Sequence, residues 1–433
     1  MAQNNFSVSE PFLPPLGGER GGWSSRFATR PTSLTLVAEG RETELERKVI
    51  AAPVLSVDTD VPAVRFAFVD GLRGLSALAI VVFHLWWYEP APFPLGESVN
   101  WLTQTALLRT RGGVQVLLVI SGFVIAYTLR KTWVTPREVL SFLARRVVRL
   151  VPAYWVAIGF ALLVDLLCRT VFKLPSPCDA PPSLPRVAAH LVFLQDVLGF
   201  SSLSAGLWTV CIEMQFYVVA ILGWGLSQRL TTRSDIGHPQ PRVAALLAVF
   251  ATPALVSLCY WQRLESTEPW VTHYLWKFFL GMVTWWTLDR KVPLWVFVSV
   301  VTIAVGHLVF ELTLDTLFEW EFEIPSANAI AITTAIAIFI AGRRERLHVW
   351  LNWPWLQHLS RISYSLYLIH FPVCHLLTTA GWRACHGGPT PVQAVALFGA
   401  SCAASLLAAH VLYVWVEAPS MTWAARMKRR PSN

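Results

Sequence analysis

The sequence predicts an all-α fold, a polytopic transmembrane helical bundle of about ten spans. Hydrophobic residues make up 54% of the chain and charged residues 14%. A soluble domain carries about 25% charged residues, because its surface must be wetted. The apolar residues also gather in runs close to the ~20 residues that cross the hydrocarbon of a bilayer. These observations indicate a multi-pass integral membrane protein, in an endomembrane or in the plasma membrane.

Ten apolar runs are the candidate transmembrane helices. They lie at residues 74–90, 112–129, 150–168, 206–227, 242–260, 270–288, 293–314, 328–341, 363–380 and 392–417. The stretch 187–200 is shorter and more polar than a span requires, so we expect an interfacial or re-entrant element there.

The distribution of positive charge orients these spans. With the N-terminus in the cytosol, the inner loops and the C-terminal tail hold far more Arg and Lys than the outer loops, as the positive-inside bias requires. The predicted outer loop 315–327 has four acids and no basic residue. Both termini are therefore predicted to be cytosolic. The net charge of +8 follows from this orientation, and we expect no binding to nucleic acid.

Three regions follow from this assignment. Residues 1–62 are polar and lack an apolar run, which is typical of a disordered tail, here a cytosolic N-terminal one. Residues 63–417 form the transmembrane domain, and residues 418–433 form a basic cytosolic C-terminal tail. The seven cysteines show no metal-ligand spacing, so we expect no metal and no permanently bound cofactor. A disulfide between Cys168 and Cys178 and two free thiols at these positions are alternatives that the sequence does not separate.

Ionisable residues within the spans are the first candidates for function, because each costs about 2.5–3.5 kcal/mol to insert. His84 follows Arg73 by eleven residues in the first span, which places it about 16 Å further along the helix. Glu213 lies about 10 Å from the outer end of the fourth span, at a depth that His84 shares. A carboxylate beside an imidazole fixes its tautomer, so His84 is a candidate general base. A histidine hydrogen-bonded between helices explains the spacing equally well.

Three arginines gather at the start of the third span. Arg146 and Arg149 are three positions apart and so share one helix face, and Arg145 broadens the positive charge. Guanidinium groups bind phosphate oxygens in a forked geometry. The cluster therefore predicts a phosphate-binding site at the inner membrane surface, with a positive-inside anchor as the alternative.

Other spans supply hydrogen-bond donors. Tyr217 lies in the fourth span and Lys277 near the middle of the sixth, while Tyr364, Tyr367 and His370 lie in the ninth. Donors of this kind stabilise an oxyanion that develops during a reaction.

Five segments resemble, in order, the signatures of the membrane acyltransferase-3 family, which includes bacterial O-antigen acetyltransferases. They are FVDGLRGLSALAIVVFH, GGVQVLLVISGFVI, ARRVVRLVPAYW, LWTVCIEMQFY and ISYSLYLIHFPV. The likeness spans about residues 66–417, nearly everything except the two tails. At two positions an acid usual in the family is replaced, by Gln115 and by Met214.

The resemblance implies a ten-helix core that moves an acyl group, commonly acetyl, from cytosolic acyl-CoA to a hydroxyl. In the family's motif of an arginine and a histidine eleven residues later, His84 is the expected catalytic residue. Arg146 and Arg149 match its donor-binding motif. The remaining matches to family motifs are Arg73, Glu213, Ser363, Tyr364, Tyr367 and His370.

The sequence thus predicts a membrane acyltransferase that uses acyl-CoA as co-substrate. We expect the CoA phosphates on Arg145, Arg146 and Arg149, and a hydroxyl-bearing sugar, glycan or lipophilic metabolite as acceptor. His84 is expected either to deprotonate that hydroxyl or to carry the acyl group transiently. A proton-coupled transporter is the alternative, because buried His, Glu and Lys also form proton relays. A catalytically silent membrane scaffold is a third hypothesis.

Overall fold

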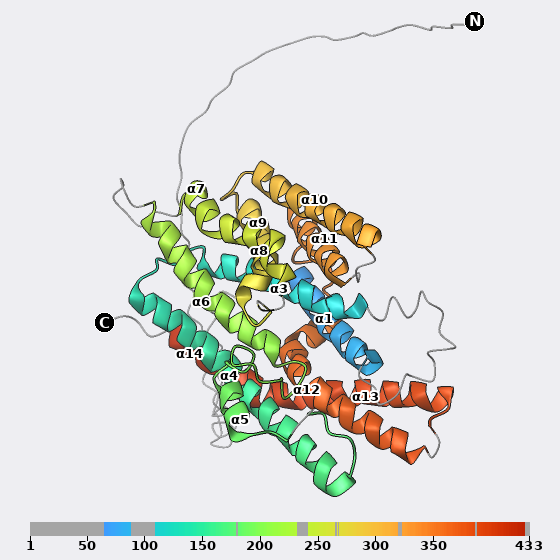
Figure 1. The fold of residues 1–433 in the computed structure, drawn as a ribbon. Helices are drawn as coiled ribbons and strands as arrows, with labels where there is room; N and C mark the ends of the chain where they lie inside the picture. The colour runs from blue at the N-terminus through green and yellow to red at the C-terminus, as the bar shows by residue number, and fades with distance from the viewer. Residues whose placement is uncertain are drawn as a thin grey trace, which may run out of the picture. The chain divides into compact units, whose positions relative to one another are not determined.

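A computed structural model describes residues 65–87, 109–178, 181–231, 241–264, 266, 268–318, 323–385 and 388–428. The chain divides into two units, Met1–Pro62 and Ala63–Asn433. The predicted N-terminal tail, residues 1–62, lies outside the described residues. Within those ranges the regular structure is entirely helical, which confirms the predicted fold class (Figure 1).

Each predicted span coincides with a helix or with a continuous run of helical segments. The helices are α1 (Ala67–Trp87), α3 (Gly113–Leu129), α4 (Pro136–Leu167), α6 (Trp208–Arg229), α9 (Val271–Leu288), α10 (Leu294–Phe318), α11 (Glu323–Arg343), α12 (Pro354–Ala384) and α13 (Pro391–Leu412). The predicted span 242–260 is made of α7 (Val243–Leu246), the π-turn η4 (Leu247–Ala251) and α8 (Thr252–Cys259).

Eight of the helical segments in the described part are long and apolar enough to cross a membrane. The two predicted spans outside that set are α9 and α12. Nearly all of α9 is buried among other helices, as is most of α12. These two helices face protein more than lipid, so polar side chains such as Lys277, His370 and several tyrosines are tolerated in them. These side chains lower the mean hydropathy of both helices.

Local signals start several helices where the chain enters them. Thr135 accepts a hydrogen bond from the backbone N–H of Glu138, and Pro136 occupies the first turn of α4, where a missing N–H costs nothing. Thr390 and Gln393 form a reciprocal capping box at the start of α13. Ser183 caps α5 (Leu184–Leu191) by accepting a hydrogen bond from the backbone N–H of Arg186.

Several helices extend beyond their predicted bounds, among them α1, α12, α4 and the C-terminal helical run. α4 begins at Pro136 rather than near residue 150, so the arginine cluster lies inside a 32-residue helix and Pro152 in its interior. The predicted C-terminal tail is helical up to Lys428, because the π-turn η7 (Tyr413–Glu417) continues into α14 (Ala418–Lys428), which packs on α4. Polar helical turns beyond the apolar runs are invisible to a search for hydrophobic spans.

The stretch 187–200 does not contain a spanning helix. Only α5, with eight residues, is helical there, and turns follow it. Its His190 is fully buried, and its Nε2 accepts a hydrogen bond from the backbone N–H of Leu203. Burial lowers the pKa of His190 below its usual value. Cys168 and Cys178, the candidate disulfide, are both free thiols.

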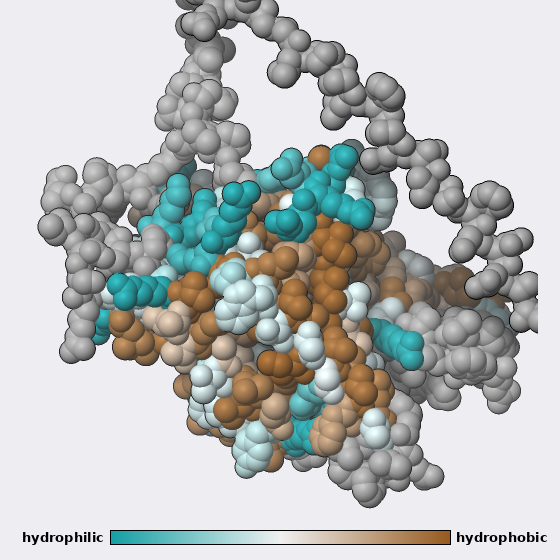
Figure 2. Space-filling model, turned by 90° about the horizontal axis from the view of Figure 1, so that it is seen from above, coloured by the Kyte–Doolittle hydropathy of each residue, from teal (hydrophilic) through white to brown (hydrophobic). Residues whose placement is uncertain are grey.

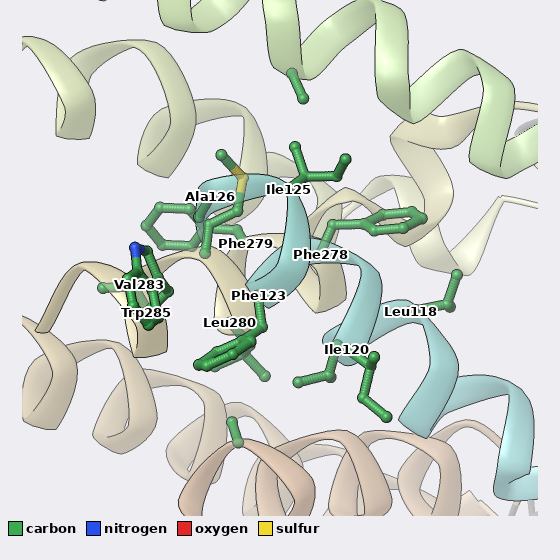
Figure 3. Packing of buried hydrophobic residues seen from close by; sticks show 14 of the residues in the cluster. Leu118, Ile120, Phe123, Ile125, Ala126, Phe278, Phe279, Leu280, Val283 and Trp285 are labelled. Carbon is green, nitrogen blue, oxygen red and sulfur yellow. The ribbon is translucent and has the colours of Figure 1, made fainter. Parts of the chain in front are cut away.

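Helices α3 and α9 cross at close range, and Figure 3 shows buried side chains of both helices there. A Cβ on Gly122 would overlap the carbonyl oxygen of Phe278, and a Cβ on Gly281 would overlap that of Val119. The two backbones therefore touch, which small residues permit between helices in a membrane. Side chains of both helices pack around the crossing, among them Phe123 and Leu280.

A second close approach joins α1 to α12. A Cβ on Gly74 would lie 2.9 Å from the backbone nitrogen of Ser360. One end of this pair is fixed by Gln357, whose side-chain amide donates to the carbonyl oxygen of Ala67 at 2.9 Å. The other pairs of neighbours include α10 with α11 and α12 with α13, which Figure 1 shows side by side.

The exposed surface fits a lipid environment. Large apolar side chains on α4, α6 and α10 face outward, for example Leu166, Leu222 and Val298. Figure 2 shows one face, on which hydrophobic residues cover a broad area and hydrophilic residues gather along its border.

The glycine crossing leads to a stability prediction. Gly122→Ala and Gly281→Ala should each lower the midpoint of thermal unfolding in detergent, because the helices must separate and overpacking costs about 1–3 kcal/mol or more. Gly306→Ala on α10 is the matched control, since nothing lies within 4 Å of its Cβ position and Ala favours helix over Gly. An unchanged midpoint for both crossing variants would contradict the role given to the contact.

Candidate active site

Described residues of the bundle line two neighbouring cavities, and most of the sequence-predicted site residues divide between them. The first, of about 500 Å³, we call the arginine cavity. Its polar lining consists mainly of Arg65, Asp70, Arg73, Ser121, Thr128, Arg146, Arg149, Thr209, Glu213, Tyr217, Ser360, Arg361, Ser363, Tyr364, Tyr367 and Glu417. On the predicted orientation, most of these lie at the cytosolic half of the helices.

Aromatic rings and an acid position Arg146 in the arginine cavity. Its guanidinium carbon lies 4.7 Å from the ring centre of Tyr217 and 5.3 Å from that of Phe142. Such stacking holds an arginine while leaving its N–H groups to bind an anion. The hydroxyl of Tyr217 donates a hydrogen bond to Oε1 of Glu213, one helical turn earlier on α6. Glu213 thereby fixes the ring against which Arg146 packs.

Hydrogen bonds from neighbouring helices hold α4 near Pro152, which lies three residues after Arg149. A proline inside a helix cannot donate to the carbonyl four residues earlier, and its ring disturbs that turn. Two neighbouring helices donate to carbonyls in this region: Ser420 of α14 to Arg149 at 2.9 Å, and Tyr364 of α12 to Leu150 at 3.0 Å. The carbonyl that Pro152 leaves without its helical donor is that of Val148, so these two bonds tie other helices to the turn next to it.

Glu417 is an acid of this cavity that the sequence analysis did not single out. It is 4% exposed, and its Oε2 accepts hydrogen bonds from the hydroxyl of Ser365 at 2.6 Å and from its backbone N–H at 3.3 Å. A lone acid near the end of the last apolar run was the signal that could have identified it.

The second cavity, of about 480 Å³, we call the histidine cavity. Its polar lining consists of His84, Arg111, Gln115, Ser202, Gln262, Glu268, His273, Tyr274, Lys277 and Tyr367. Lys277 is 4% exposed, and its Nζ lies 5.7 Å from the ring centre of Tyr274. Arg111 and Glu268 come from connections between spans, where nothing in the sequence pattern marked them.

His84 faces another histidine in the structure. Its Nδ1 lies 2.8 Å from the carbonyl oxygen of Ile80 and 3.2 Å from Nε2 of His370. The two imidazole rings are 4.9 Å apart between centres. The structure therefore gives His84 and Glu213 different partners, His370 and Tyr217, and places them in the linings of different cavities.

The two cavities meet at Val114 and Tyr367, which line both. The hydroxyl of Tyr367 accepts a hydrogen bond from Thr209 at 2.8 Å. Along α1, residues up to Ala77 line the arginine cavity, and residues from Ile80 to His84 line the histidine cavity. The cavities are thus stacked along the helix axes, with Tyr367 and Val114 between them.

Among the sequence-predicted site residues, His370 and Arg145 line neither cavity. His370 instead contacts His84, whereas the guanidinium of Arg145 donates to the hydroxyl of Ser141 on the same helix. Arg73, Arg146, Arg149, Glu213, Tyr217, Tyr364 and Tyr367 share the arginine cavity, whereas His84, Lys277 and again Tyr367 line the other. Within the described ranges, no group of three His, Cys, Asp or Glu side chains is placed to hold a metal ion.

A family model described as an acyltransferase domain matches residues 66–410. The chain belongs to the acyltransferase-3 family. The match covers the lining of the histidine cavity and most of the lining of the arginine cavity, and it confirms the resemblance seen in the five motifs. This acyltransferase-3 protein is therefore a multi-pass membrane enzyme that transfers acyl groups, and its family disfavours the transporter hypothesis.

Curated relatives carry names that agree with this family. The chain is 25% identical over 320 residues to a putative membrane-bound transacylase, BcsY, of Komagataeibacter xylinus, covering 70% of this chain and 72% of that protein. It is 24% identical to nodulation protein 10 of Rhizobium leguminosarum, covering 72% and 84%. It is 26% identical to the peptidoglycan O-acetyltransferase OatA of Listeria monocytogenes, covering 39% of this chain and 26% of OatA. No solved structure gives a significant match.

The serine next to Glu417 allows a controlled test of this part of the site. Ser365→Ala removes a hydrogen bond to a buried acid, and such bonds contribute about 1.5–3 kcal/mol. We expect a lower thermal unfolding midpoint for Ser365→Ala than for Ser363→Ala, a buried neighbour whose hydroxyl donates only to the carbonyl of Ser360. Equal midpoints would show that Glu417 does not depend on Ser365.

Proposed function

We propose that this acyltransferase moves an acetyl group from acetyl-CoA in the arginine cavity to a hydroxyl of an acceptor in the histidine cavity. The observation that carries the proposal is the meeting of the two cavities at Tyr367, with Arg146 and Arg149 on one side and His84 on the other. A thioester held near Tyr367 reaches both cavities, and neither reactant has to cross the bundle.

The donor is proposed to enter from the cytosolic side, where the predicted topology places the arginines. CoA carries phosphates, and forked guanidinium groups suit phosphate oxygens better than an ammonium does. Five arginines line the cavity against three acids, Asp70, Glu213 and Glu417. Asp70 pairs with Arg65, and Glu213 accepts a hydrogen bond from Tyr217. In this proposal Glu213 acts beside the donor, where it orients Tyr217 and Arg146.

His84 is proposed to act as the general base. Its imidazole takes the proton from the acceptor hydroxyl, and the oxygen attacks the thioester carbonyl carbon. The tetrahedral intermediate collapses, the carbon–sulfur bond breaks, and the proton passes from His84 to the CoA sulfur. Lys277 lines the same cavity. The hydroxyl oxygen of Tyr367 accepts a hydrogen bond from Thr209, which leaves its own O–H able to donate. Either group can donate to the developing oxyanion, which is worth about 2.7–4 kcal/mol per donor.

The acceptor is proposed to be a hydroxyl of a sugar, a glycan or a lipophilic metabolite. Polar and aromatic groups line the histidine cavity side by side, among them Trp208, Tyr274 and Gln262, and such a mixture suits sugar rings. A relative named as a peptidoglycan O-acetyltransferase supports a glycan.

The base is tested with radiolabelled acetyl-CoA and purified protein in detergent. We expect release of CoA or labelled product from the wild type and a loss of about 100-fold or more in His84→Ala, the range of general-base catalysis. His375→Ala is the control, because His375 contacts the carbonyl of Pro175 and lines neither cavity. Equal rates for wild type and His84→Ala would overturn the role of His84, and a label bound covalently to His84 would replace the base by an acyl carrier.

The donor site is tested by equilibrium binding of acetyl-CoA to two neighbouring arginine variants. Loss of charge-assisted hydrogen bonds to phosphate costs about 1.5–3 kcal/mol, so Arg146→Ala should weaken binding about 10- to 100-fold. Arg145→Ala should weaken it much less, since Arg145 bonds within its own helix. A larger effect of Arg145→Ala would move the donor to the outer face of α4.

A further inference from the structure

The tautomer of His370 follows from its surroundings. His370 is fully buried, and its Nδ1 lies 3.0 Å from the carbonyl oxygen of Leu366 and 2.9 Å from that of Tyr367. Carbonyl oxygens only accept hydrogen bonds, so Nδ1 must carry a proton. In a neutral imidazole the other nitrogen, Nε2, then has a lone pair and accepts.

The tautomer of His84 follows in turn. Its Nδ1 lies 2.8 Å from the carbonyl oxygen of Ile80, so it must also carry a proton. That same Nδ1 lies 3.2 Å from Nε2 of His370. Two N–H groups cannot point at each other at this distance, which excludes a proton on Nε2 of His370 and hence a doubly protonated His370. The Nδ1–H of His84 is shared between Ile80 and His370.

We propose that His370 is the positioning residue of the transfer reaction: its Nε2 accepts Nδ1–H of His84 and keeps Nε2 of His84 as the proton acceptor. The proposal rests on the proposed function of His84 as base. It gives His370 the place that a carboxylate holds in hydrolase triads, and it links α1 to α12 at that point. When His84 takes the acceptor's proton, the positive ring still donates Nδ1–H to both acceptors, so no further proton has to move.

The backbone carbonyls next to Nδ1 of His370 also explain why a histidine can act as the positioning residue. Leu366 and Tyr367 belong to α12 itself, and the carbonyls one turn before His370 are the acceptors that fix its ring. The backbone of α12 thus determines the protonation of His370, which determines that of His84. A buried acid at position 370 would bring a charge into this dry interior at a cost of several kcal/mol.

The first test reads the tautomers directly and needs no turnover. Nitrogen-15 NMR of the full chain in bilayers, labelled on the histidine rings, separates protonated from unprotonated ring nitrogens. Spectra of His84→Ala and His370→Gln assign the two rings. We expect a protonated Nδ1 and an unprotonated Nε2 for both histidines of the wild type. A proton on Nε2 of His84 would overturn the proposal.

The second test compares two variants of similar size at position 370. The side-chain carbonyl of His370→Gln can still accept Nδ1–H of His84, whereas His370→Leu has no acceptor. At saturating acetyl-CoA we expect kcat of His370→Leu to fall about 10-fold or more, with KM for acetyl-CoA unchanged, and His370→Gln to keep most of the wild-type kcat. A merely structural role predicts equal losses in both variants, which would overturn the proposal.

The outcomes separate this inference from the proposed function. If wild type does not turn over acetyl-CoA at all, the proposed function fails, while the NMR spectra still decide the pairing of the two histidines. If His370→Leu does not fold, as thermal unfolding would show, the spectra of the wild type and of His370→Gln decide it.

Discussion

The backbone contact of α1 with α12 determines where the two histidines lie. Gly74 allows α1 to approach the backbone of α12 at Ser360. Ten residues further along each helix, about 15 Å away, His84 of α1 meets His370 of α12. The two helices therefore run parallel in register, and a side chain at Gly74 would shift that register. The proposed catalytic pair is thus set by a glycine that touches neither histidine.

The interior of the bundle also illustrates what hydrocarbon demands of polar groups. A polar atom without water needs a partner from the protein, and here partners come from other helices or from the preceding turn. Tyr364 and Ser420 donate to carbonyls near Pro152, and Ser365 donates to Glu417. These bonds join α4, α12, η7 and α14 around the arginine cavity. The contacts that stabilise the bundle therefore also fix the helices that line the arginine cavity.

Much of the fold could be predicted from the sequence, because hydrophobic length is a local property and each predicted span coincides with helical structure. The turns of α4 before residue 150 and all of α14 could not, since polar helix outside the apolar runs leaves no such signal. Among the site residues, Arg146 and His84 could be identified because ionisable side chains within or beside an apolar run are rare. Their partners were not predictable in this way, because His370 is 286 positions from His84. The rotation of each helix about its axis determines which side chains face each other, and the sequence pattern does not give it.

The stacking of two cavities along the helix axes has a consequence for the membrane itself. If one cavity is filled from the cytosol and the other from the opposite side, Tyr367 and Val114, which line both cavities in the described part of the chain, stand between the two solutions. The protein must then pass an acyl group across a barrier while remaining tight to protons and ions. The hydrogen bond between Thr209 and Tyr367 lies at this barrier. Weakening it would let protons and ions leak between the cavities and so dissipate the electrochemical gradient of the host membrane.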